Sequence, residues 1–194
     1  MRVVAGELRG RRLLAASGRE TRPTSERARA GLFDWLGPRV ADARVLDLFA
    51  GTGALGIEAL SRGARSAVFV ERARPALRAL RSNLAELELE SRAQVVERDL
   101  ARGLGSRVVE GGAYDLVLAD PPYEGGWLAR LLACETLPTL LPPDAVVIVE
   151  RSVRAPAAPG SGRLQYGGSK RYGETAFDWY ENAAEGGEQG RADS

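Results

Sequence analysis

The residues best suited to chemistry are Asp120-Pro121-Pro122-Tyr123, which directly follow a predicted strand. The Asp120 carboxylate and the Pro121 carbonyl oxygen can each accept a hydrogen bond from an amine or amide nitrogen. The two prolines fix φ at about −65° and so hold these acceptors still, while Tyr123 adds a ring that can stack on a planar base. This catalytic loop, residues 120–123, suits the alignment of a nitrogen lone pair with a methyl donor, a reaction that needs geometry rather than a strong base.

A second chemical pattern is the segment Asp47-Leu48-Phe49-Ala50-Gly51-Thr52-Gly53, which carries a predicted strand into a glycine-rich turn and then a helix. Open α/β sheets bind ligands at this place. Gly51 and Gly53 have no Cβ, so we expect the backbone there to come close to a ligand. Asp47 precedes the turn, where a carboxylate can hold a cationic ammonium group.

Two further acids end the next two predicted strands. Glu71 can accept hydrogen bonds from both hydroxyls of a ribose, and Asp99 can accept one from an adenine amino group. Adenosine and an α-amino group occur together in S-adenosylmethionine, which is therefore the predicted cofactor. We place Ala50, Arg72 and Leu100 in the same predicted pocket, as neighbours of the turn and of the two acids.

Other functions fit parts of this pattern. Gly51, Gly53 and Gly56 also satisfy the G-x-G-x-x-G spacing of dinucleotide sites, so a nicotinamide-dependent oxidoreductase is an alternative. Hydride transfer would give the catalytic loop no role, and the chain has no histidine to act as an acid. A non-catalytic RNA-binding module is a further alternative. Without histidine, catalysis must use carboxylates, backbone or geometry, and we expect no metal.

Basic side chains gather in the two flanks of the chain. Residues 1–30 hold eight Arg and three Glu, and residues 151–173 hold five basic residues and no acid, whereas residues 31–150 hold 13 basic and 17 acidic residues. An acidic centre between basic flanks suits a cationic cofactor beside a polyanion. The predicted RNA contacts are Arg2, Arg9, Arg11, Arg12, Arg22, Lys170 and Arg171.

The segments that must position these residues alternate between strands and helices. Nearly continuous apolar strands such as 45–49 and 145–149 are typical of a parallel sheet covered by helices on both faces. The pattern predicts a doubly wound α/β fold with strands at 44–49, 66–71, 93–97, 114–119 and 145–150 and helices at 54–62, 74–89, near Leu100 and at 126–137. A first helix, capped by Thr24 or Ser25 and ended by Gly37-Pro38, precedes them, and 163–166 with 176–180 are expected to form a closing antiparallel hairpin.

At 194 residues the chain fits one domain. We expect a basic N-terminal hairpin over 1–23, with 18–23 as its linker, a core domain over 24–180 and a disordered tail over 181–194. The hairpin is expected to bury little, so the cofactor site should not depend on residues 1–15. Cys134 is expected to be a buried thiol. No apolar run approaches the roughly 20 residues that span a bilayer, and no signal-peptide pattern is present, so we expect no membrane contact and a cytoplasmic location.

Together these residues resemble the Rossmann-like methyltransferases with a D/N-P-P-Y/F/W loop, which methylate adenine N6, cytosine N4, guanine N2 or glutamine amides. The chain is also similar, over roughly residues 1–180, to the bacterial small-subunit rRNA guanine-N2 methyltransferases of the RsmD type. The closer resemblance is carried by Arg2-Val3-Val4-Ala5-Gly6, Arg9-Gly10-Arg11-Arg12-Leu13, Arg22-Pro23-Thr24 with Arg27, Arg29, Leu32 and Phe33, residues 46–64, Phe69-Val70-Glu71, residues 115–123 and Tyr172-Gly173-Glu174-Thr175.

The resemblance implies the fold of class I S-adenosylmethionine-dependent methyltransferases and methyl transfer to N2 of one guanine in 16S rRNA. The substrate would be the small ribosomal subunit or its late assembly intermediate, and we expect a monomer. The catalytic loop would hold the guanine, with Asp120 also bordering the cofactor. By family position, the cofactor would be lined by Asp47, Phe49, Gly51 and Gly53, with Glu71 on its ribose, Asp99 on its adenine and Thr24 near its methionine end.

The chain departs from the family where Ala30 and Gly31 replace a Glu and a polar residue after Arg29, which puts an ion pair of the first helix in doubt. Adenine N6 of DNA or RNA and a glutamine amide remain alternative targets of the same loop. A glutamine methyltransferase more often carries Asn at position 120 and an added helical domain.

Overall fold

The computed structural model describes residues 1–15, 25–122 and 125–183. Within this part of the chain the strands form one sheet in the order β3-β2-β1-β4-β5-β7-β6. The first five strands run parallel, and β7 pairs antiparallel with both β5 and β6. The strands are β1 (Arg44–Leu48), β2 (Ser66–Glu71), β3 (Ala93–Glu97), β4 (Leu116–Ala119), β5 (Val146–Ser152), β6 (Leu164–Tyr172) and β7 (Thr175–Asn182). The predicted doubly wound, mostly parallel sheet with a closing antiparallel hairpin is confirmed.

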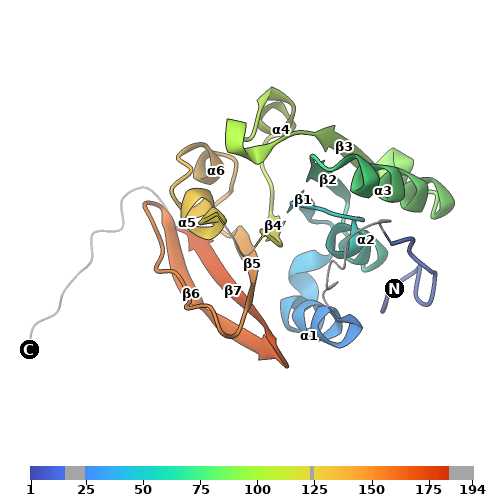
Figure 1. Cartoon of the computed structure of the whole chain (residues 1–194), viewed down its shortest axis with the longest axis horizontal. Helices are drawn as coiled ribbons and strands as arrows, with labels where there is room; N and C mark the ends of the chain where they lie inside the picture. Colours follow the sequence, from blue (N-terminus) through green and yellow to red (C-terminus); the bar gives the residue numbers. More distant parts are fainter. Residues whose placement is uncertain (16–24, 123–124, 184–194) are drawn as a thin grey trace, which may run out of the picture.

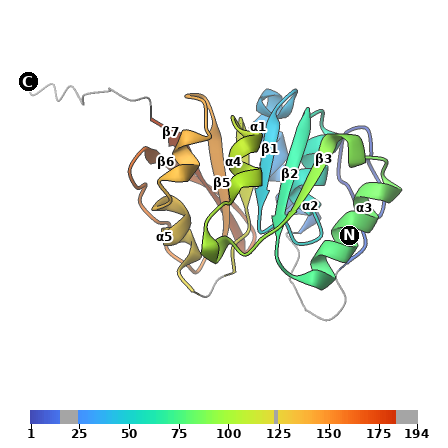
Figure 2. The ribbon, with the colours of Figure 1, turned by 90° about the horizontal axis from the view of Figure 1, so that it is seen from above.

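Helices cover both faces of the sheet (Figures 1 and 2). Strand residues alternate between two apolar clusters, as Val45 and Leu46 do, because successive side chains of a strand point to opposite faces. One face carries α1 (Glu26–Leu36), α2 (Ala54–Ser61) and α3 (Arg74–Glu86), and the other carries α4 (Ser106–Gly111), α5 (Trp127–Leu132) and α6 (Thr136–Thr139). Short 3₁₀ turns, η1 (Gly37–Val40), η2 (Glu90–Arg92) and η3 (Leu100–Arg102), complete the described elements.

Three predicted helix boundaries need comment. Ser25 caps α1, since its Oγ accepts the Ala28 N–H at 3.1 Å; the alternative cap, Thr24, lies outside the described residues. The predicted helix 74–89 is too long, because α3 ends at Glu86 and Glu88 has a φ of 58°. The predicted helix 126–137 is wrong as one unit.

That predicted helix is divided into α5 and α6 at the segment around Cys134. Pro138 has no N–H to bond the carbonyl of Cys134, and its ring would clash with that carbonyl in a continuous helix. Cys134 at this break is only half-buried, so the prediction of a buried thiol is wrong.

The N-terminal segment, residues 1–15, differs most from its prediction. Its chain ends meet in a single bridge between Arg2 and Arg12 rather than in two strands. Val3 and Leu13 are 2% and 5% exposed and join the apolar cluster of α1, α2 and α3. The segment lies beside α2 and α3 (Figure 2), and these two side chains attach it to the core instead of staying exposed.

The C-terminal hairpin is longer than predicted. Strand β7 includes Glu181 and Asn182, which the prediction assigned to the tail. Asn182 is buried, and its Nδ2 donates to the carbonyl of Leu141 at 2.8 Å. Residues 184–194 and the predicted linker 18–23 lie outside the described residues.

The structure explains why position 31 is a glycine. The hydroxyl of Tyr172 in β6 donates to the Gly31 carbonyl at 2.8 Å, and a Cβ at position 31 would meet the Tyr172 ring at 2.1 Å. The departure from the family pattern at Gly31 therefore lets α1 pack closely on the β6–β7 hairpin.

Candidate active site

The predicted site residues meet at the carboxyl ends of the parallel strands. The glycine turn follows β1, which lies between β2 and β4 in the sheet. Leu48 pairs with Ala119, and the Asp120 N–H points to the Leu48 carbonyl at 3.4 Å, so the catalytic loop starts beside the turn. Chain connections reverse direction across β1 and β4, and open α/β sheets bind ligands at such a switch point.

The turn is held by the acid at the end of β2. Oε2 of Glu71 accepts the Gly51 N–H at 2.8 Å, and Oε1 accepts the N–H groups of Arg72 and Ala73, both at 2.7 Å. Glu71 therefore fixes the glycine turn against β2. Its predicted contact with a ribose stays a prediction.

Gly51 and Gly53 of the turn and Gly56 of α2 have different surroundings. A Cβ on Gly51, where φ is 56°, would meet nothing closer than the Phe49 carbonyl oxygen at 4.0 Å, so space is open there. A Cβ on Gly53 would meet Leu80 at 2.5 Å, and one on Gly56 would meet Phe69 at 2.3 Å. Gly51 thus offers the open backbone surface, whereas Gly53 and Gly56 allow close packing of α2.

Asp47 is buried where β1 meets α2, with 1% of its surface exposed. Its Oδ2 accepts the Gly56 N–H at 2.9 Å. Burial raises the pKa of Asp47 to about 8; the Gly56 hydrogen bond opposes this rise, and the nearby charges of Asp120 and Glu71 add to it. Asp47 therefore joins the strand to the helix, and its predicted contact with an ammonium group stays a prediction.

Asp99 connects the ends of β2 and β3. Its Oδ1 caps η3 by accepting the Ala101 N–H at 3.0 Å, and its Oδ2 accepts from Nη1 of Arg72 at 3.1 Å. The Ala101 hydrogen bond and Arg72 lower the pKa of Asp99 against a smaller opposing effect of burial. Leu100 is half-buried against the cluster of α4 to α6. Arg72 and Asp99 are thus in contact, with Leu100 next in the chain, and their predicted role at the cofactor stays a prediction.

The described part of the catalytic loop is Asp120, Pro121 and Pro122; Tyr123 and Thr24 lie outside the described residues. Pro121 is buried and Asp120 is half-buried. Burial raises the pKa of Asp120 to about 6. The group is therefore mostly ionised at neutral pH and can accept a hydrogen bond.

Sequence reasoning missed Trp127, the first residue of α5, which contacts the glycine turn. The rings of Phe49 and Trp127 lie 5.2 Å apart in an edge-on arrangement. Phe49 has a φ of 61°, a left-handed conformation that non-glycine residues rarely adopt and that often occurs at functional sites. No spacing rule in the sequence pairs a residue of the turn with one seven positions after Asp120.

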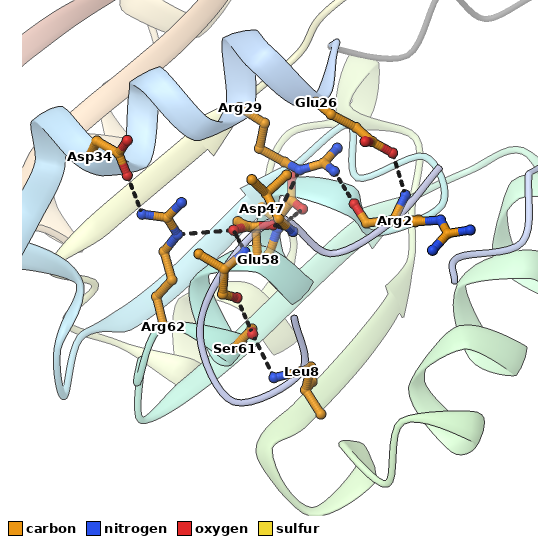
Figure 3. Close-up of polar contacts among 12 residues, drawn as sticks. Arg2, Leu8, Glu26, Arg29, Asp34, Asp47, Glu58, Ser61 and Arg62 are labelled. Carbon is orange, nitrogen blue, oxygen red and sulfur yellow. Dashed lines mark hydrogen bonds and ion pairs between the residues drawn. The ribbon is translucent and has the colours of Figure 1, made fainter. Parts of the chain in front are cut away.

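Sequence reasoning also missed the Glu58 cluster, made of Glu58, Arg29, Arg62, Val4 and Ala5 (Figure 3). Glu58 is fully buried in α2 and accepts the N–H groups of Val4 and Ala5 at 2.8 and 3.0 Å. It also accepts from Nε of Arg29 at 3.3 Å and Nε of Arg62 at 2.9 Å. The ion pair of the first helix therefore exists. An acid inside the apolar helix Ala54–Ser61 was the available signal.

The cluster anchors the N-terminal segment further. Nη2 of Arg29 donates to the Arg2 carbonyl, and Ser61 Oγ accepts the Leu8 N–H at 3.0 Å (Figure 3). Asn83 of α3 accepts the Leu14 N–H at 2.7 Å and donates to the Thr52 carbonyl of the glycine turn at 3.0 Å. Asn83 therefore connects Leu14 with the glycine turn, and the expectation that the cofactor site does not depend on residues 1–15 stays a prediction.

The predicted RNA contacts lie in two places. Arg2, Arg9, Arg11 and Arg12 are exposed on the N-terminal segment. On β6, Arg171 is exposed and Lys170 is half-buried, and Arg22 lies outside the described residues. The Lys170 ammonium lies 5.9 Å from the ring centre of Trp35 in α1.

Two negative findings concern the described residues. Among residues 1–15, 25–122 and 125–183, no group of His, Cys, Asp or Glu side chains could hold a metal ion. In the same part of the chain, every helix is too short or too polar to cross a membrane.

The sheet order and the glycine turn define a Rossmann-like fold, and the relatives that share it are methyltransferases. A family model described as Conserved hypothetical protein 95 matches residues 1–181, and the chain belongs to this family. Ribosomal RNA small subunit methyltransferase D of Escherichia coli (strain K12) is 35% identical over 188 residues, which cover 96% of this chain and 92% of that protein. The protein of the same name from Haemophilus influenzae is 32% identical over 150 residues, covering 77% of this chain and 78% of that one.

Solved structures agree with these relatives. The Escherichia coli protein yhhF superimposes with a TM-score of 0.80 at 33% identity, covering 95% of this chain and 98% of that one. A hypothetical protein from Thermus thermophilus gives a TM-score of 0.77 at 29% identity, covering 93% and 99%. The resemblance seen in the sequence is confirmed.

Proposed function

We propose that this chain transfers a methyl group from S-adenosylmethionine to the exocyclic N2 of a guanine in 16S rRNA, the guanine at position 966 by its resemblance to the family. The observation that carries the proposal is the position of Asp120 and Pro121 at the end of β4, beside the glycine turn at the end of β1. The small-subunit rRNA methyltransferases among its relatives support the choice of RNA.

The residues present fit the proposed cofactor. Gly51 offers an open backbone surface, and Glu71 and Asp99 place carboxylates beyond the ends of β2 and β3. We assign Glu71 to the ribose and Asp99, with Arg72 and Leu100 beside it, to the adenine. The turn residues Phe49 and Ala50, the buried Asp47 and Gly53, and Thr24 complete the proposed lining. When bound, S-adenosylmethionine supplies an electrophilic methyl group.

The protein then has to present the acceptor nitrogen correctly. The lone pair of an exocyclic amine is delocalised into the ring, so the two N–H bonds must be directed before the nitrogen can react. The Asp120 carboxylate accepts one N–H and the Pro121 carbonyl accepts the other, which leaves the lone pair facing the methyl group. As the new N–C bond forms and the S–CH₃ bond breaks, leaving a neutral thioether, Asp120 can also take up the proton that the nitrogen loses. Preorganised acceptors of this kind act through positioning.

The substrate must be held by its phosphates as well. Arg2, Arg9, Arg11 and Arg12 present exposed guanidinium groups on the N-terminal segment, and Lys170 and Arg171 add charge on β6. Basic side chains on protein surfaces bind RNA phosphates and release counterions. We assign these residues, with Arg22, to the small subunit or its late assembly intermediate. We propose that the chain acts there as a cytoplasmic monomer.

Two experiments test this function. Isothermal titration with S-adenosylmethionine and with NAD separates a methyltransferase from an oxidoreductase, and we expect binding of the first alone. A tritiated methyl-transfer assay on unmethylated small subunits and on naked 16S rRNA should then label RNA. Label found in adenine or in a glutamine amide would show that the target is one of the alternatives and not guanine N2. Cofactor binding without transfer to either substrate would favour a non-catalytic RNA-binding module.

A further inference from the structure

The rings of Phe49 and Trp127 contact each other at the glycine turn of the candidate site. Phe49 belongs to the turn, and Trp127 is the first residue of α5, directly after Gly125 and Gly126. Gly125 and Gly126 have φ values of 89° and 65°, conformations that let the chain turn back sharply. At the start of α5 the indole ring of Trp127 thus contacts the ring of Phe49 in the glycine turn.

The side of the turn on which Trp127 lies is informative. In the sheet order β3-β2-β1-β4-β5, the acids assigned to adenosine follow β2 and β3, on one side of β1. Trp127 follows the loop that starts at β4, on the other side of β1. Trp127 therefore comes from the half of the sheet that carries Asp120, whereas Glu71 and Asp99 come from the other half.

The ring of Trp127 is held in place without being closed off. The guanidinium of Arg130, three residues later in α5, lies 5.4 Å from the ring centre of Trp127. Phe49 packs at 5.2 Å, yet Trp127 and Phe49 both remain half-buried. An aromatic pair fixed by neighbours but partly open to solvent is suited to contact with a planar ligand.

We propose that Trp127, supported by Phe49, forms an aromatic wall of the pocket that receives the target base. The inference rests on the proposed function and extends it, because it adds a positioning residue beyond the catalytic loop. Taking a base out of a stacked RNA strand costs stacking energy, and a stacking surface in the protein offsets this cost. Trp127 would thereby hold the ring of the base while Asp120 and Pro121 direct its amine.

The test compares Trp127→Phe with Trp127→Leu. Both variants keep an apolar side chain, but only phenylalanine keeps a ring to stack. We expect Trp127→Leu to lower kcat/KM for unmethylated small subunits on the order of 10-fold or more, with Trp127→Phe within about threefold of wild type. The Kd for S-adenosylmethionine, measured by titration calorimetry, should stay within about twofold in both variants, since the wall serves the base.

Trp179→Phe is the matched control. The ring of Trp179 lies 4.8 Å from that of Trp35, tilted by 44°, on the opposite face of the sheet, and this change should cause no specific loss of kcat/KM. Equal rates for Trp127→Leu and wild type would overturn the inference while leaving the proposed function intact. So would a loss of cofactor affinity as large as the loss of kcat/KM. An inactive wild-type protein would instead refute the proposed function, and the inference with it.

Discussion

The Glu58 cluster and the catalytic loop each contain an acid that is at least partly buried, but the two acids differ in the cations that surround them. Glu58 is fully buried and accepts hydrogen bonds from two arginines and two backbone N–H groups. In the described part of the chain, no cation forms an ion pair with Asp120, and burial raises its pKa to about 6. The Glu58 carboxylate has its hydrogen-bond acceptors taken up by the protein, whereas the Asp120 carboxylate can still accept a hydrogen bond from a substrate.

This difference separates structural from chemical acids. A buried charge with cations and N–H groups around it fixes the elements that supply them, here α1, α2 and the N-terminal segment. A half-buried acid without a cation, held at a strand end before two prolines, is a typical arrangement for catalysis. Substitutions at the two sites should therefore affect different measurements, stability for Glu58 and turnover for Asp120.

The largest expected effect is on stability. Glu58→Ala would leave Arg29, whose side chain is 0% exposed, without its counterion and would remove the acceptor for the Val4 and Ala5 N–H groups. Breaking a buried pair in this way costs about 3 to 5 kcal/mol of unfolding free energy. Urea denaturation followed by circular dichroism would measure this loss.

Arg65→Ala provides the matched control for Glu58→Ala. Arg65 pairs with Asp42, but both side chains are exposed, so the urea midpoint should not change. If Glu58→Ala and wild type unfold at the same urea concentration, the cluster does not anchor the N-terminal segment and the comparison fails.

The next effect concerns the cofactor. Glu71→Ala would remove the acceptor for the Gly51 N–H together with the proposed ribose contact. We expect binding of S-adenosylmethionine to weaken by about 1.5 to 3 kcal/mol, the range for a hydrogen bond to a charged group. Titration calorimetry should show no such loss for Glu97→Ala, which changes an exposed acid at the end of β3. Unchanged affinity in Glu71→Ala would leave Glu71 as a strand-end acid only.

A smaller effect should appear in the pH dependence of kcat. Asp120 must be ionised to accept an N–H, and its pKa is raised to about 6, so activity should fall as pH decreases through this value. The fall should approach about tenfold per pH unit below the pKa. Single-turnover rates with saturating substrate, measured between about pH 5 and 8, would show it. A rate that stays constant down to pH 5 would mean that Asp120 is not the titrating acceptor.

The smallest effect concerns RNA affinity. Changing Arg9, Arg11 and Arg12 to Ala should reduce the slope of log affinity against log salt by about 0.7 to 0.9 for each phosphate that the protein no longer neutralises. Arg39→Ala, an exposed arginine in η1, should leave the slope unchanged. Substitution is preferable to deleting residues 1–15, because deletion would also remove two hydrogen bonds to Glu58. A triple variant with the wild-type slope would place the RNA surface elsewhere.

Much of the fold followed from the sequence because its signals are local. Apolar strands such as Val146–Val149 and the turn after Asp47 indicate buried parallel strands and the end of the sheet that binds a ligand. The N-terminal segment was misjudged because its burial depends on Glu58 and Asn83, which are distant in the sequence. Periodicity reports which residues are apolar, whereas the docking of a short segment depends on partners that only the folded chain brings together.

In the candidate site, too, local features could be predicted from the sequence and long-range contacts could not. The acids Glu71, Asp99 and Asp120 could be placed because each follows a strand, and parallel strands end at one edge. The sequence did not predict the hydrogen bonds that the acids make. Glu71 accepts the Gly51 N–H, and the buried Asp47 accepts the Gly56 N–H. Trp127 was missed because its contact with Phe49 depends on how the loop turns back at two glycines.

The most direct test of this account compares wild type and Asp120→Ala on unmethylated small subunits, with nucleoside analysis of the labelled RNA. The account predicts N2-methylguanosine from the wild type and a loss of kcat on the order of 10² or more in Asp120→Ala, with little change in the Kd for S-adenosylmethionine. Near-normal kcat in Asp120→Ala, or a methyl group on any atom other than guanine N2, would contradict it.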